Sequence, residues 1–112
     1  MVYDFACKIK NVKNKDALND ETLKGIIADV DANYSIQLDF KFVLPSADRS
    51  SEFLVKAQAS VSSMPVFHDR ELEEAIEIFK SYLDEIAQAI HGEVSTSDGF
   101  YNNTQSFKRL FT

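Results

Sequence analysis

Two stretches of the chain alternate between hydrophobic and polar residues. From Tyr34 to Leu44 every second residue is hydrophobic, and the alternation returns from Phe53 to Ser62. A period of two predicts strands with one buried face and one open face. The polar stretch 46–51 follows Pro45 and joins the two strands, so we expect an antiparallel hairpin.

A helical period follows the hairpin. We expect one long amphipathic helix over 69–91, with Asp69 as N-cap and His91-Gly92 at its C-terminal end. Its hydrophobic stripe consists of Leu72, Ile76, Phe79, Leu83, Ile86 and Ile90. The helix would be roughly 34 Å long, about as long as an eleven-residue strand, so it should lie across the hydrophobic face of the hairpin.

The N-terminal third adds a strand and one ambiguous element. Residues 2–12 alternate and predict a first strand. Residues 20–32 fit a helix capped by Asn19 or Asp20, although Gly25 weakens it by roughly 1 kcal/mol. The other interpretation makes 26–31 a strand.

The pattern weakens after Gly92. Asp98-Gly99 favours a type I′ turn between short strands on either side. We divide the chain into an α+β domain over 1–99 and an aromatic C-terminal tail over 100–112, which either packs into the core or exchanges as an arm.

These elements predict an α+β fold with an antiparallel sheet of three to five strands and one long helix on one face. The order strand–helix–strand–strand–helix–strand looks like a ferredoxin-like split β-α-β domain. This superfold carries many unrelated functions, so the resemblance implies none.

Charge and cysteine content indicate in which cellular compartment the protein is expected. The net charge is −6, and Cys7 is the only cysteine. We expect Cys7 to be a buried hydrophobic residue in a reducing, cytoplasmic protein. No signal-peptide pattern and no hydrophobic run of about 18 residues is present, so we expect no membrane partner.

The sequence indicates no enzyme, cofactor or metal. His68 and His91 flank the long helix and would lie too far apart to share a site. A weak alternative is a small enzyme or metal site at His68, Asp69 and Glu71, but no metal-binding spacing or phosphate loop is present.

The outward face of the long helix is the first candidate binding surface. It is formed by Glu73, Glu77, Asp84 and Gln88. We interpret it as an acidic ridge for a protein partner with a basic surface. A compact acidic chain of this kind suits an accessory or inhibitor protein of a phage or mobile element. The alternative is a solvated helix face without a partner.

Self-association is the second expectation. Hydrophobic residues beside the helix stripe and in the tail are costly to leave exposed. The predicted oligomer interface comprises Ile78, Tyr82, Phe100, Tyr101, Phe107, Leu110 and Phe111. A phage structural or assembly subunit with a fixed oligomer is the corresponding alternative function.

Nucleic acid is a further alternative partner. The basic start of the chain would carry it through Lys8, Lys10, Lys13 and Lys15. We expect no stacking platform on the open face of the hairpin. That face should present Ser35, Gln37, Asp39, Lys41, Lys56, Gln58, Ser60 and Ser62.

Overall fold

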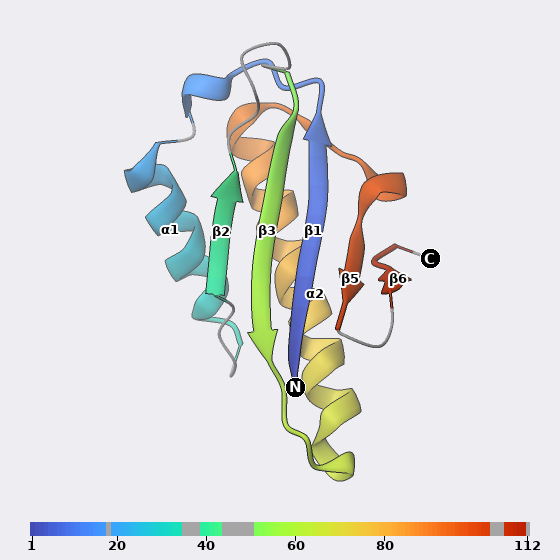
Figure 1. The fold of residues 1–112 in the computed structure, drawn as a ribbon. Coiled ribbons are helices and arrows are strands. Elements are labelled where there is room, and N and C mark those ends of the chain that lie inside the picture. Colours follow the sequence, from blue (N-terminus) through green and yellow to red (C-terminus); the bar gives the residue numbers. More distant parts are fainter. Residues whose placement is uncertain (18, 35–38, 44–50, 104–106, 112) are drawn as a thin grey trace.

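A computed structural model describes the chain except for residues 18, 35–38, 44–50, 104–106 and 112. Two helices pack on one face of an antiparallel sheet, so the predicted α+β class is confirmed (Figure 1). The elements are β1 (Val2–Lys10), η1 (Lys15–Ala17), α1 (Asp20–Asp31), β2 (Asp39–Val43), β3 (Phe53–Ser60), α2 (Pro65–Ile90), β4 (Glu93–Val94), η3 (Thr96–Asp98), β5 (Phe100–Asn102) and β6 (Phe107–Arg109).

The sheet is built around β1. Its strand order is β2-β3-β1-β5-β6, and β4 also pairs with β1. The predicted hairpin is present as β2 and β3, with Phe40 opposite Ala57. The N-terminal half of the predicted strand 34–44 lies largely outside the described residues. Because β3 is inserted between β1 and β2, the order fits a split β-α-β unit; the ferredoxin-like assignment stays a prediction.

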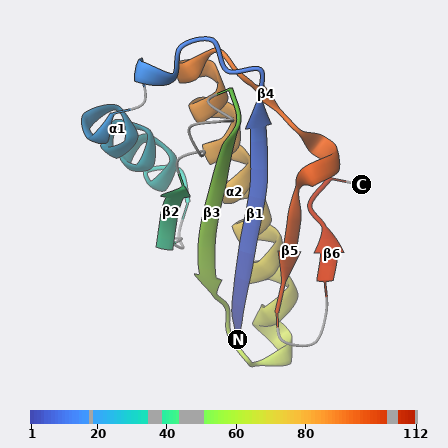
Figure 2. The same ribbon diagram turned by 45° about the horizontal axis from the view of Figure 1, so that its top comes forward.

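Both helices cover the same face of the sheet (Figure 2). In β3, Val55 and Ala57 are buried while Lys56 and Gln58 are exposed, as a period of two requires. Phe5 of β1 meets Phe79 of α2 with ring centroids 5.3 Å apart. Among the described residues, no helix lies on the other face of the sheet, and we call it the open face.

The ambiguous segment is a helix. Asn19 caps α1, because its side-chain oxygen accepts a hydrogen bond from the Thr22 amide at 2.9 Å. Val30 is buried, and Ile26 and Ile27 pack against the core. The strand interpretation of 26–31 is therefore wrong.

The long helix begins earlier than predicted. It starts at Pro65 rather than Asp69, with Met64 as N-cap, and the His68 amide closes the first turn on the Met64 carbonyl at 3.1 Å. Proline suits the first helical position because its φ is already helical and its missing N–H would be unpaired there anyway. This first turn does not continue the hydrophobic stripe of the helix, because Val66 in the turn is 79% exposed.

The C-terminal end of α2 is capped by backbone hydrogen bonds. His91 adopts the left-handed conformation with φ 52°, and the Gly92 amide donates to the Ala87 carbonyl at 2.9 Å. Glycine is needed at position 92 for close packing and not for the turn, because a Cβ there would lie 2.6 Å from Cγ2 of Ile9. The chain can thus pass directly from the helix to the edge of β1.

The C-terminal segment belongs to the sheet. β4 and β5 both pair with β1 and not with each other, so the predicted turn at Asp98-Gly99 is wrong; Gly99 has φ −95° and follows the short helix η3. Leu110 is buried, and Tyr101 stacks on Phe5 with centroids 5.8 Å apart. Residues 100–102 and 107–111 are therefore part of the same folded unit as β1.

Candidate functional site

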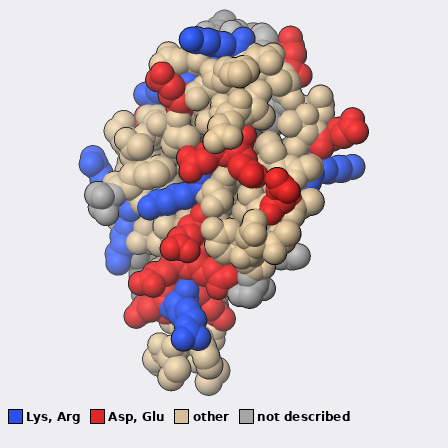
Figure 3. All heavy atoms as spheres, turned by 180° about the vertical axis from the view of Figure 1, so that it is seen from behind, with Lys and Arg blue, Asp and Glu red and all other residues tan. Residues whose placement is uncertain are grey.

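The two helices carry most of the negative charge, and together we call them the helical layer. They hold eleven acidic and three basic residues, a net −8, whereas the rest of the chain holds seven acidic and nine basic residues, a net +2. Figure 3 views the molecule from behind, the side that α1 and α2 cover, and shows acidic side chains gathered there. The fold thus separates charge that the sequence spreads along the chain.

The predicted acidic ridge lies on this surface. Glu73, Glu77, Asp84 and Gln88 are all exposed on α2. At 100° per residue they fall within about 60° of one another, so they form one stripe. Within the described part of the chain, none of the three acids has a basic group within 4.0 Å.

A groove between α1 and α2 adjoins the stripe, and we call it the helix groove. Its volume is about 550 Å³. It is lined by Thr22, Gly25, Ile26, Asp29, Glu85, Gln88 and Ala89. Gln88 also lines a second hollow with Asp84 and His91, so the stripe and the groove are continuous. No pattern in the sequence indicates the groove, because its lining comes from two helices that the hairpin separates along the chain.

Gly25 lines the helix groove at a position that does not require glycine. A Cβ built on Gly25 would meet no atom within 4 Å, so no close packing requires glycine here. Its φ is not positive either. Glycine inside a helix costs roughly 1 kcal/mol relative to alanine, and at this position neither backbone conformation nor contact offsets that cost.

Glu85 is the unusual group in the groove. Its Oε2 atom is buried and has no hydrogen-bond partner among the described residues. Burial, and next the negative charge of Asp29, raise the pKa of Glu85 above its ordinary value of 4.5. A carboxylate in this position is stabilised by an added cation, because a cation would offset both effects.

Three cations interrupt the helical layer: Lys24 of α1, which is exposed, and Arg70 and Lys80 of α2. Arg70 is exposed near the start of α2. The ammonium of Lys80 lies 5.1 Å from the centre of the Phe111 ring, a cation–π contact with the C-terminal segment. Lys80 is therefore turned toward the end of the chain and not paired with Glu77 or Asp84.

The structure separates the residues predicted to form an oligomer interface. Ile78, Tyr82 and Leu110 are at most 3% exposed and belong to the core of the single chain, so they offer no surface for a second copy to dock on. The remaining ones are half-buried, except Phe107, which is 66% exposed. Tyr82 in addition donates a hydrogen bond to Asp31 at 2.6 Å, so α1 covers the flank of α2 that seemed to need a partner.

Exposed hydrophobic residues gather elsewhere, at the start of α2. Met64, Val66 and Phe67 are 58%, 79% and 44% exposed, at the end of the molecule where Val2 is also exposed. We call these four residues the apolar end. The run Met64-Pro65-Val66-Phe67 is the available signal in the sequence, but a proline can end a strand as well as begin a helix.

The residues of the alternative enzyme or metal site at His68 form structural hydrogen bonds. His68 accepts from the Tyr3 hydroxyl at Nε2, 3.1 Å away, and donates from Nδ1 to the Ser62 carbonyl at 3.2 Å. Glu71 accepts a hydrogen bond from the Ser62 amide. These side chains fasten the connection between β3 and α2, and within the described residues no three His, Cys, Asp or Glu side chains form a metal-binding group.

The basic start of the chain is dispersed. Lys8 and Lys10 lie on β1, Lys13 is exposed in the next loop, and Lys15 begins η1. Lys10 pairs with Asp98 at 2.9 Å, and hydrogen bonds from Ser95 and Lys10 lower the pKa of that aspartate. Lys10 is therefore partly neutralised by Asp98.

An aromatic pair lies on the open face outside the hairpin, the part for which we expected no stacking platform. Phe100 and Phe107 stack there, with ring centroids 4.8 Å apart. Lys56 and Gln58 lie on that face as predicted, while Ser35 and Gln37 fall outside the described residues.

Comparisons with known proteins leave the function to be argued from this geometry. No family model matches the chain, and neither the curated proteins nor the solved structures contain a match. Within the described residues, no helix is long and hydrophobic enough to span a bilayer.

Proposed function

We propose that the chain is a non-enzymatic protein-interaction module that binds a basic protein surface through its helical layer. The observation that carries the proposal is the helix groove, where the buried Oε2 of Glu85 has no hydrogen-bond partner among the described residues. The −8 charge of the two helices surrounds it. A cytoplasmic setting is part of the proposal and is supported by the unpaired Cys7.

The groove would receive a lysine or arginine side chain of the partner. An arginine entering between Gly25 and Glu85 would supply donors to the buried oxygen and offset the repulsion from Asp29. The stripe of Glu73, Glu77 and Asp84 would add long-range attraction, which raises association rates and falls with salt. The groove would thus provide specificity, and the stripe would raise the association rate.

A basic peptide tests this proposal. We would titrate the ¹⁵N-labelled protein with a synthetic arginine-rich peptide and follow backbone amide shifts by NMR. We expect the largest shifts around Gly25, Asp29 and Glu85. The double variant Asp29→Asn/Glu85→Gln should weaken binding at least tenfold, since it removes both carboxylates of the groove.

The matched control changes the net charge equally at another place. Asp16→Asn/Glu93→Gln removes two exposed acids outside the helical layer and should weaken binding less than twofold. Equal losses in the two double variants would show attraction to net charge alone and would contradict the groove. Shifts confined to the sheet would contradict the proposal altogether.

Self-association is the second candidate, and the apolar end supports it. Val66 and Phe67 on one helical turn expose hydrophobic surface that a second copy could bury. Light scattering should then show that Val66→Asp converts an oligomer into a folded monomer. A monomeric wild-type chain would exclude this candidate and leave the groove proposal intact.

A further inference from the structure

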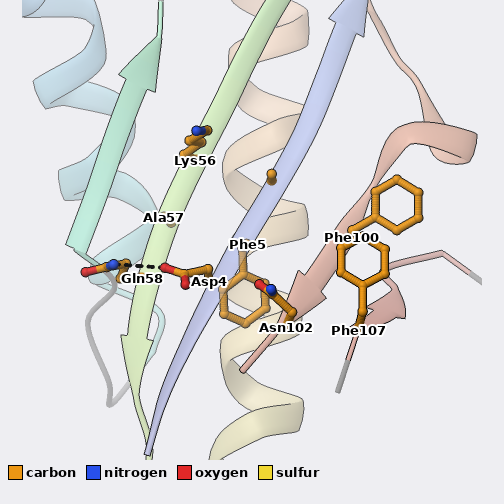
Figure 4. A pocket seen from close by; sticks show the side chains of 9 residues that line it. Asp4, Phe5, Lys56, Ala57, Gln58, Phe100, Asn102 and Phe107 are labelled. Carbon is orange, nitrogen blue, oxygen red and sulfur yellow. Dashed lines mark hydrogen bonds between the residues drawn. The ribbon is translucent and has the colours of Figure 1, made fainter. Parts of the chain in front are cut away.

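We propose that the open face of the sheet binds single-stranded nucleic acid, with a base stacked on Phe107 and phosphates near Lys56 and Arg109. The site is a hollow of about 500 Å³ over β1, and we call it the sheet hollow (Figure 4). It is lined by Asp4, Phe5, Ala6, Lys56, Ala57, Gln58, Phe100, Asn102 and Phe107. It lies on the opposite side of the sheet from the helix groove, so the two proposals rest on different residues.

The pairing register builds the hollow. Ala6 faces Lys56 on one side and Phe100 on the other, and Phe100 in turn faces Arg109. Residues opposite one another in an antiparallel pair share a face of the sheet. The small Ala6 side chain therefore forms a floor between longer neighbours.

The aromatic pair supplies a stacking surface. Phe100 and Phe107 are stacked at 28°, and Phe107 remains 66% exposed although its partner is half-buried. Figure 4 shows the two rings side by side at one wall of the hollow. An exposed ring beside a hollow can stack with any base, and such stacking supports single-strand binding without sequence preference.

Polar groups line the rest of the hollow. The Gln58 amide donates a hydrogen bond to Asp4 at 2.8 Å and fixes the position of this carboxylate, so a bound phosphate would lie away from it, toward Lys56 or Arg109. Asn102 lies between Asp4 and Phe107 in the register and can bond to a base edge. Lys56 and Arg109 lie on either side and are exposed.

The charge distribution permits an anionic ligand despite the net charge of −6. Outside the two helices the chain carries +2, and the −8 of the helical layer is on the other side of the sheet. At physiological salt, exposed charges are screened beyond about 8 Å. Duplex nucleic acid would need a longer row of cations than the open face provides.

Fluorescence anisotropy with labelled oligo(U) and oligo(dT) tests the proposal on the full chain. The strands should be about ten nucleotides long, within the usual ~4–16 nucleotide site of single-strand binders. We expect both to bind at least tenfold more tightly than a duplex of equal length. A preference for oligo(U) would indicate contact with the 2′-hydroxyl, whereas equal binding would indicate backbone and base contacts alone.

Paired variants locate the site. Phe107→Ala should weaken single-strand binding at least fivefold, while Phe67→Ala, an exposed phenylalanine at the apolar end, should leave it unchanged. Ala6→Leu should fill the floor and weaken binding, whereas Ser60→Leu, exposed at the end of β3, should not. Lys56→Gln should reduce the dependence of affinity on salt, because one phosphate contact is lost.

Three results would overturn the proposal. The first is no anisotropy change up to about 100 µM, which is the weak limit of non-specific binding. The second is an affinity for single strands that Phe107→Ala leaves unchanged. The third is tighter binding of the duplex than of the single strands. The double variant Asp29→Asn/Glu85→Gln should bind the oligonucleotides at least as well as the wild type. The peptide and oligonucleotide experiments can therefore fail separately.

Discussion

The two faces of the sheet are made by the same strands but meet different surroundings. Toward the helices, Phe5, Val55 and Ala57 are closed off completely and determine stability. Toward the open side, Ala6, Lys56 and Gln58 alternate with them and contribute a hollow. The comparison predicts that residues facing the helices determine stability, while residues on the open face can be altered with little effect on it.

The largest expected effect tests this division directly. Phe5→Ala removes a side chain that contacts Phe79 and Tyr101 and should lower the free energy of unfolding by about 3–5 kcal/mol. Lys56→Ala, on a neighbouring strand but on the open face, should change it by less than about 0.5 kcal/mol. Urea unfolding measures both, and similar losses would contradict the separation of the faces.

The same comparison can be made within the C-terminal segment. Leu110→Ala should cost about 2–4 kcal/mol, because Leu110 is only 3% exposed against the core. Phe107→Ala should cost less than about 1 kcal/mol, since Phe107 is 66% exposed and loses mainly its contact with Phe100. If the segment exchanged as an arm instead, Leu110→Ala would change the oligomeric state and make stability depend on protein concentration.

The smallest expected change in stability is at Glu85 in the helical layer, where a substitution should stabilise the protein instead of destabilising it. The pKa of Glu85 is raised in the folded protein, so the folded state favours the protonated form and stability is lost as the pH rises through that pKa. Glu85→Gln should therefore slightly stabilise the protein at pH 7, and the difference should diminish as the pH falls below the ordinary pKa of a glutamate. Asp84→Asn, at an exposed position next to Glu85 on the same helix, is the control in thermal melts at both pH values.

A stabilising Glu85→Gln would support a binding role for this carboxylate. Residues that cost stability are retained where function needs them. The variant should bind the basic peptide less tightly while melting at a higher temperature. Loss of stability at pH 7 would instead show that Glu85 has a favourable structural contact.

The fold was predictable where the periodicity is long. The α2 stripe from Leu72 to Ile90 and the β3 alternation both correspond to buried residues. The start of α2 was missed because Pro65 has two meanings, the end of a strand and the first residue of a helix. The strands β4 and β5 are only two and three residues long, too short for any period to show.

The candidate sites were less predictable, for a geometric reason. The acidic stripe of α2 was found because Glu73, Glu77 and Asp84 are neighbours on one helix. The helix groove joins Gly25 to Glu85, and the sheet hollow joins Ala6 to Phe100; both depend on contacts between elements far apart in the sequence. A single sequence contains no local signal for such pairs.

The burial of Cys7 gives the molecule a built-in chemical probe. Its side chain has no exposed surface, and its thiol donates to the Ser95 carbonyl at 3.4 Å. Burial, and next the charge of Asp98, raise the pKa of the thiol to about 11. Alkylating reagents attack the thiolate, so they reach Cys7 only in molecules whose central strand has separated from its neighbours. The rate of alkylation in native buffer therefore measures how often the sheet opens, without any added label.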